Sequence, residues 1–154
     1  MKVTDAWMLA AVPACLVACA TAPEHPREVV DVPLAAAPGN LGEVGTASLA
    51  RRGDETSVVI TISGVSPPVT RPLRLYAFIY PGTCGKLTAT PVVSMNQTRR
   101  GEATTGNGPL RLHRDAQIPL ENLRSGDYAL VVRSAPWDGS VDLFCGNLKA
   151  ARVS

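Results

Sequence analysis

The chain has 154 residues, which is enough for one domain with a sizeable hydrophobic core. Its hydrophobic fraction of 45% is ordinary for a globular protein. A formal net charge of +2 is too small to indicate a nucleic-acid-binding protein, so no nucleic-acid partner is expected.

The N-terminal segment has the form of an export signal. A short head that contains Lys2 is followed by an apolar run, and no charge lies between Asp5 and Glu24. A run of about a dozen apolar residues suits a signal peptide, whereas a membrane-spanning helix needs roughly 20. Pro13 also disfavours a spanning helix. We therefore expect a signal peptide over residues 1–18.

The apolar run ends in Leu16-Val17-Ala18-Cys19, which resembles the lipobox of bacterial lipoproteins at all four positions. The resemblance implies cleavage before Cys19 and acylation of its thiol and new amino group, so that the protein is held on the membrane. Cys15 would be removed with the signal. Ala20, in place of Asp, implies the outer membrane, and we expect the periplasmic face.

Two other interpretations of this segment remain. The first is an ordinary signal peptide in which the cysteine occurs by chance. The second is a metal site formed by Cys15 and Cys19, although no His or further Cys lies nearby in the sequence to complete a tetrahedral set.

Residues 19–40 contain four prolines and show no sustained helical or strand period. The composition predicts a Pro/Ala-rich tether, which would reach on the order of 60 Å if it were fully extended. An alternative is that Val29 to Leu34 docks on the folded domain as an edge strand.

From residue 41 to 154 the pattern predicts a single domain of short strands separated by turns. A polar turn at Arg52 to Glu55 is followed by "TSVVITISGV", in which Val58, Ile60 and Ile62 would share one face of a strand. This pattern indicates a hairpin. No long amphipathic helical period is present. The predicted class is all-β, an antiparallel β-sandwich. Further strands are expected in "PLRLYAFIY", "TPVVSMN", "LRLHRDAQIPL", "DYALVVRS" and "SVDLFCGNL".

Cys84 and Cys145 are the thiols that remain once Cys15 is removed and Cys19 is acylated. An even count in an oxidising envelope favours a disulfide between them, with free thiols as the alternative.

The segments around these cysteines resemble the copper/zinc superoxide dismutase-like sandwich and the related CHRD-type domains. The resemblance lies in "FIYPGTC" from Phe78 to Cys84, "YALVVRS" from Tyr128 to Ser134 and "LFCGNL" from Leu143 to Leu148. The resemblance implies that the all-β fold is an antiparallel Greek-key β-sandwich of the superoxide dismutase-like kind, with the immunoglobulin-like kind as the alternative, and it supports the disulfide.

The sequence departs from this family at the metal ligands. The family's His-x-His positions are occupied by Phe78 and Tyr80, and its Val-His position falls on Arg133. The position of an anion-guiding arginine is occupied by Asp142, which has the opposite charge. The resemblance therefore implies a protein without the copper site and without the dismutase activity, and we expect no cofactor.

Few other side chains suggest catalysis. His25 lies in the predicted tether, and His113 is expected to be exposed within an arginine-rich strand. Neither histidine can therefore assemble a metal centre or a nucleophilic site. The arginine pairs are interleaved with acids, so we expect solvated strand edges and turns. These pairs are Arg51-Arg52, Arg71/Arg74, Arg99-Arg100 and Arg111/Arg114.

These observations favour a lipid-anchored envelope protein with a non-enzymatic interaction or structural module, which contacts the membrane through Cys19 and an envelope protein partner through the domain. One alternative is a metal-binding or redox enzyme with atypical ligands. Another is a ligand-binding or inhibitor lipoprotein that uses the loop from Arg99 to Pro109. The pattern gives no prediction of oligomeric state.

Overall fold

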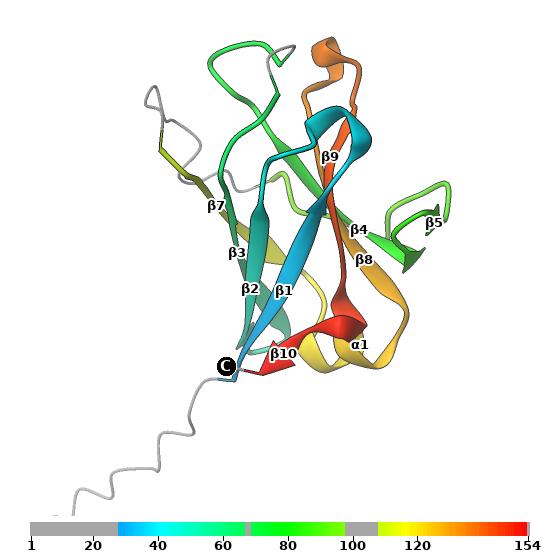
Figure 1. Cartoon of the computed structure of the whole chain (residues 1–154). Helices are drawn as coiled ribbons and strands as arrows, with labels where there is room; N and C mark the ends of the chain where they lie inside the picture. Colours follow the sequence, from blue (N-terminus) through cyan, green and yellow to red (C-terminus); the bar gives the residue numbers. More distant parts are fainter. Residues whose placement is uncertain (1–27, 67–68, 98–107, 154) are drawn as a thin grey trace, which may run out of the picture.

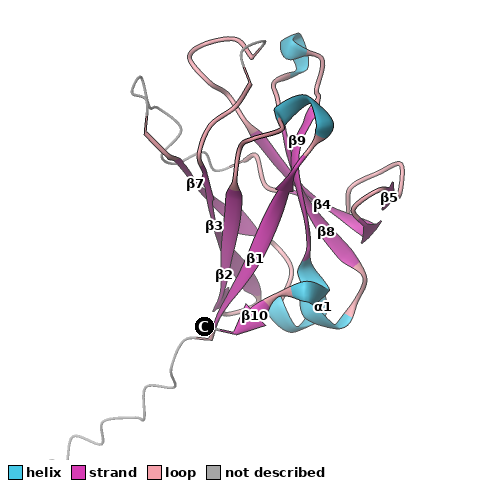
Figure 2. Cartoon of the chain, in the orientation of Figure 1, coloured by secondary structure: helices cyan, strands magenta, loops and turns pink. Residues whose placement is uncertain are grey.

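The computed structural model describes residues 28–66, 69–97 and 108–153 (Figure 1). Antiparallel strands dominate, with short helices at the ends of the sheet (Figure 2). The strands are β1 (Val29–Ala36), β2 (Gly45–Arg52), β3 (Glu55–Ile62), β4 (Tyr76–Thr83), β5 (Lys86–Leu87), β6 (Val93–Ser94), β7 (Leu110–Ala116), β8 (Tyr128–Arg133), β9 (Asp142–Asn147) and β10 (Arg152–Val153). The helices are η1 (Pro38–Asn40), α1 (Leu120–Ser125), η2 (Pro136–Asp138) and η3 (Leu148–Ala150).

The strands form one curled ten-stranded sheet in the order β5-β4-β8-β9-β1-β2-β3-β7, with β10 beside β1 and β6 beside β4. All of the pairings are antiparallel. The curl brings β2, β3 and β7 opposite β4, β8 and β9 (Figure 1). The predicted all-β antiparallel class is therefore confirmed, and its finer description as a Greek-key sandwich stays a prediction.

The predicted hairpin is formed by β2 and β3, which pair along their full length from Gly45↔Ile62 to Arg52↔Glu55. The turn between them needs a residue with positive φ, and Gly53 supplies it with φ +62°. In β3 the β-branched residues Val58, Ile60 and Ile62 are all buried. Alternation in the sequence thus corresponds to one face turned into the core.

The first strand lies inside the range predicted as a tether. β1 pairs with β2 from Val29 to Leu34 and with β9 at Ala35 and Ala36, so it belongs to both halves of the sheet. Val30 and Val32 are fully buried. The segment from Val29 does dock as a strand, but it lies between two neighbours in the sheet and not at an edge. The folded part therefore begins near Val29, earlier than the predicted residue 41.

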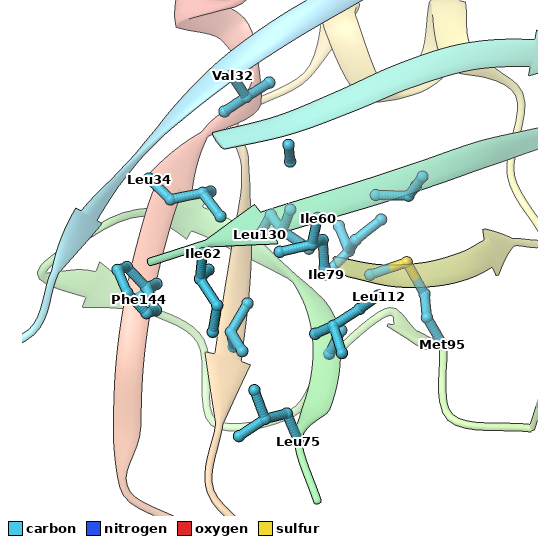
Figure 3. Packing of buried hydrophobic residues seen from close by; sticks show 14 of the residues in the cluster. Val32, Leu34, Ile60, Ile62, Leu75, Ile79, Met95, Leu112, Leu130 and Phe144 are labelled. Atoms are coloured by element: carbon cyan, nitrogen blue, oxygen red, sulfur yellow. The ribbon is translucent and has the colours of Figure 1, made fainter. Parts of the chain in front are cut away.

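One hydrophobic core fills the space inside the curl, and Figure 3 shows its centre. Ile60 from β3 and Leu112 from β7 lie close to Ile79 from β4 and Leu130 from β8 (Figure 3). These side chains come from segments far apart in the chain, so core packing joins the two halves of the sheet in addition to the strand pairing through β1.

α1 has only six residues, Leu120–Ser125, and buries Leu120 and Leu123 against the core. It was not predicted, because a single turn and a half gives no helical period. Among the described residues, no helix has both the length and the apolar character needed to cross a membrane.

Candidate functional site

The outer face of β4 and β8 carries the three positions where the dismutase-like resemblance would place metal ligands. Because side chains alternate along a strand, Phe78 and Tyr80 lie on the face opposite to the buried Ala77 and Ile79. Arg133 lies at the end of β8, the strand that pairs with β4. The structure thus brings Phe78, Tyr80 and Arg133 together.

The guanidinium of Arg133 contacts the side chains of Asp142, Tyr80 and Phe78. Nε donates a hydrogen bond to the carboxylate of Asp142, and Nη1 donates to the hydroxyl of Tyr80 at 2.5 Å. Cζ lies 4.9 Å from the ring centroid of Tyr80 and 5.7 Å from that of Phe78, within cation–π range. We refer to Phe78, Tyr80, Arg133 and Asp142 as the arginine cluster.

The electrostatics of the arginine cluster favour a permanent cation. The hydrogen bond from Arg133 to Asp142 raises the pKa of the guanidinium above its ordinary value, against the opposing effect of burial. A guanidinium has donors only and no lone pair for a metal. Tyr80 already accepts a hydrogen bond from this cation. The cluster can therefore link β4, β8 and β9 and cover the sheet, but it presents no imidazole-like ligand.

The arginine cluster forms one end of a small apolar layer on the outer face of the sheet. Ala129 and Val131 of β8 are fully buried although they face away from the core that contains Leu130 and Val132. In the strand register, Tyr80 lies opposite Ala129. The aromatic rings thus cover backbone and small side chains that would otherwise face water.

Cys84 and Cys145 form the predicted disulfide, with a Cα–Cα distance of 5.8 Å. Cys84 lies in the turn between β4 and β5, and its backbone N–H donates to Oδ1 of Asn147 at 2.8 Å. Gly82 in the same hairpin has φ +101°, and a Cβ there would lie 2.4 Å from the carbonyl oxygen of Lys86. The disulfide and the Asn147 hydrogen bond therefore attach a tight hairpin to β9.

His113 is exposed on β7, as expected. The described part of the chain contains no group of three or more His, Cys, Asp or Glu side chains placed to hold a metal ion. The expectation that the paired arginines are solvated is wrong at Arg114, which is only 2% exposed. Its guanidinium donates to the carbonyls of His113 and Leu75 at 2.9 and 3.2 Å. β7 turns Leu112 and Arg114 inward and Arg111 outward, so these two arginines lie on opposite faces.

Several predicted sites lie outside the described residues. They are the signal peptide, the lipobox with Cys19, His25, and positions 99–107 of the proposed binding loop.

Two surface hollows involve charged side chains that already have partners. One, of about 480 Å³, lies beside β6 and β7 and contains the ion pair between Arg52 and Asp115, whose atoms are 3.0 Å apart. The other, of about 500 Å³, lies beside α1 and contains the pairs Arg51–Glu121 and Arg124–Glu28. Charged groups that are already paired bind a further ion only weakly. Both hollows are therefore weaker candidates for a functional site than the arginine cluster.

Sequence reasoning identified Phe78, Tyr80, Arg133 and Asp142 one by one, but it missed that they contact one another. A signal was available, because Arg133 ends one predicted strand and Asp142 begins the next, where a hairpin brings opposite charges face to face. The structure pairs these two residues across β8 and β9.

Comparison of the chain with protein-family models, with curated proteins and with solved structures gave no match in any of the three. The lipobox and the dismutase-like resemblance thus rest on the residues quoted for them.

Proposed function

We propose that the protein is a lipid-anchored component of the bacterial outer membrane, in which a Greek-key β-sandwich on the periplasmic side serves as a non-enzymatic interaction or structural module. The lipobox that ends in Cys19 supports the anchor. The start of β1 at Val29 leaves the nine residues 20–28 between Cys19 and the first strand. Such a segment reaches roughly 30 Å when extended. This is about half the reach expected for a tether over residues 19–40.

The observation that carries the non-enzymatic part of the proposal is the arginine cluster. The positions at which a dismutase-like site would place imidazoles hold two aromatic rings and a guanidinium that is hydrogen-bonded to Asp142 and Tyr80. A fixed cation in this place opposes the binding of a metal ion.

The anchor is tested by the intact mass of protein extracted from membranes. We expect a chain that begins at Cys19 and carries three acyl chains, and we expect the Cys19→Ala variant to lose all of them. A mature chain with an unmodified Cys19, or one that retains Met1, would refute the anchor.

The absence of an enzymatic metal site is tested on the purified full chain by elemental analysis followed by a superoxide turnover measurement. We expect neither stoichiometric copper nor zinc after incubation with each ion, and no turnover above buffer. Stoichiometric copper or zinc, or turnover of superoxide, would favour the redox alternative instead.

A further inference from the structure

The sheet ends in two edges of very different length. At one end β4 is bordered by the two-residue strands β5 and β6, whereas at the other end β7 runs for seven residues, Leu110–Ala116. β7 lies at the left margin of the sheet in Figure 1, and β3 is the only strand beside it in the described part of the chain. The outer edge of β7 therefore presents backbone N–H and C=O groups to a further strand.

The outer edge of β7 lacks the features that usually keep exposed strands from pairing. Its sequence contains no proline, and its register with β3 runs from Thr56↔Ala116 to Ile62↔Leu110 without a bulge. Arg114 points inward and is only 2% exposed, so its charge is covered by this domain and is not presented at the edge. The edge is thus suited to strand pairing along its whole length.

The outward-facing side chains of β7 are self-complementary. Arg111, His113 and Asp115 alternate with the buried residues and share the outer face of the strand. When two copies of β7 pair antiparallel about a two-fold axis beside His113, Arg111 of each copy lies directly opposite Asp115 of the other. An axis beside Arg111 or beside Asp115 would instead place two like charges opposite each other. Among the antiparallel registers, the one centred on His113 is therefore the one that pairs opposite charges.

Both charged side chains are able to form these pairs. Arg111 is exposed and makes no ion pair with a described residue. Oδ1 of Asp115 accepts a hydrogen bond from Arg52 at 3.0 Å, and no described residue donates to Oδ2. A carboxylate can accept from two guanidinium groups, so Arg111 of a second copy can bind Oδ2 while Arg52 stays in place. Exposed ion pairs contribute little free energy, so they select the register while backbone hydrogen bonds provide the affinity.

We propose that β7 pairs with β7 of a second copy of this chain, in the antiparallel register centred on His113, so that the two sheets become one. The inference goes beyond the proposed function, and it depends neither on the lipid anchor nor on the absence of a metal site. Antiparallel pairing reverses the direction of the second copy, so the two β1 strands start at opposite ends of the dimer. Two copies anchored in the same membrane would therefore lie with their strands along its surface.

The register is tested by cysteine cross-linking of the full chain, purified in detergent with Cys15 and Cys19 replaced by serine. His113→Cys places a thiol beside its own copy across the axis, so a short bismaleimide should join the two chains. Gln117→Cys is the matched control, because it is exposed and directly follows the same strand. In this register residue 117 lies opposite residue 109, and the two thiols are roughly 26 Å apart. We expect at least five times more covalent dimer from His113→Cys on a denaturing gel.

An exchange of charges separates this pairing from an unspecific contact. In the His113→Cys background, Arg111→Asp and Asp115→Arg each place like charges opposite each other twice, so each variant alone should give at least fivefold less dimer. A mixture of the two, with an affinity tag on one, restores opposite charges at both positions and should give a mixed dimer at the level of the parent. Arg71→Asp makes the same change in net charge as Arg111→Asp at an exposed loop position and should leave the yield unchanged.

Two results would overturn the pairing. Equal amounts of dimer from His113→Cys and Gln117→Cys, or none from either, would show that β7 does not meet its own copy in this register, and this comparison does not require the charge variants to fold. A mixture that gives no more dimer than its separate components would show that Arg111 and Asp115 do not face each other. Neither result affects the mass and metal tests of the proposed function.

Discussion

Arg133 stabilises the outer face of the sheet through both its charge and its flat shape. The guanidinium lies within cation–π distance of the Tyr80 and Phe78 rings, while two of its nitrogens donate to Asp142 and Tyr80. A lysine would provide the charge but not the planar group that stacks and donates in two directions at once. The side chain therefore links Asp142 of β9 to the aromatic rings of β4.

Replacement of Arg133 by alanine should destabilise the fold. Asp142 and the hydroxyl of Tyr80 would lose their partner, and both rings would gain contact with water. We expect the free energy of unfolding in urea to fall by about 1–3 kcal/mol. Arg111→Ala, at an exposed position on β7, should change it by less than about 0.5 kcal/mol. Equal effects of the two substitutions would contradict the role given to Arg133.

Glu121 should contribute to the pH dependence of stability. Its carboxylate accepts a hydrogen bond from its own backbone N–H at the start of α1 and another from Arg51, and these lower its pKa below 4.5. The folded state therefore holds this proton less tightly than the unfolded state. The stabilisation is present above the ordinary carboxyl pKa and is lost as the pH falls through the lowered value.

We expect Glu121→Gln to flatten the acid limb of the unfolding free energy measured by urea denaturation at a series of pH values. Arg51→Ala should reproduce part of this change, since it removes one of the hydrogen bonds that lower the pKa. An acid limb identical to that of the wild type in Glu121→Gln would exclude the contribution.

Arg114 shows that predicting whether an arginine is buried requires its position in the strand period as well as its charge. An arginine in a charged segment was expected to be solvated, yet strand periodicity places residues 110, 112, 114 and 116 on one face, and that face is the buried one. The period of two was available in the sequence and would have separated Arg111 from Arg114. What the sequence could not provide was the carbonyl of Leu75 as an acceptor, because that contact joins residues 39 positions apart.

At the scale of elements, β1 passes from one half of the sheet to the other. Pro33 lies between Asp31, which pairs with β10, and Ala35, which pairs with β9. A residue without an N–H is tolerated where a strand changes partners. Gly146 of β9 lies at this crossing, where a Cβ would be 2.8 Å from the carbonyl oxygen of Pro33 and 2.6 Å from a methyl carbon of Leu34.

Gly146→Ala should therefore separate β9 from β1. The carbonyl of Pro33 is backbone and cannot move without disturbing the pairing, so we expect a loss of about 1–3 kcal/mol in unfolding free energy. Gly39→Ala is the matched control, because a Cβ at Gly39 meets nothing within 4 Å. If the two variants have the same midpoint of thermal unfolding, the close approach of β1 at Gly146 does not contribute to the stability of the fold.

The disulfide connects the β4–β5 hairpin to β9 across 61 residues of sequence. In the chain-entropy model, loss of such a cross-link costs about 4 kcal/mol. We expect the Cys84→Ser/Cys145→Ser variant to lose a large part of its unfolding free energy. Backbone amides of the hairpin should exchange with solvent faster than those of β3. Hydrogen exchange that rises equally in β3 and in the hairpin would show that the disulfide has no local role.

Hairpins were predictable because their signals are local. The β2–β3 hairpin follows from alternation on both sides of Gly53, whereas β6, expected within "TPVVSMN", is only the two residues Val93–Ser94. β1 was missed as a core strand because its proline and alanines suggest a tether. Its burial depends on β9 and β10, which are more than 100 residues away in the sequence.

At the scale of the whole molecule, the boundary of the folded domain can be tested by truncation. A chain that begins at Glu28 should unfold with the same midpoint as the full chain, because β1 is complete. A chain that begins at residue 41 lacks Val30, Val32 and Leu34 from the core, and it should not show a cooperative transition. Cooperative unfolding of the shorter chain, followed by circular dichroism, would restore the boundary expected from the sequence.

The arginine cluster could be predicted only in part. The pairing of Arg133 with Asp142 joins β8 and β9, which follow each other in the chain, whereas Phe78 and Tyr80 come from β4, which pairs with β8 although it lies more than 40 residues earlier in the sequence. Sequence spacing indicates which residues share a strand, but it does not indicate which distant strands pair with each other.

The place of β1 between β2 and β9 also determines when folding can finish. β1 is the first of the described strands, and β2 follows it closely in the sequence, but its other partners are β9 and β10, which lie more than 100 residues later. Contacts of such high sequence separation form late. We therefore expect a chain that has not yet formed β9 and β10 to hold an open β1–β2–β3 meander, with one edge of β1 unpaired until those two strands are in place.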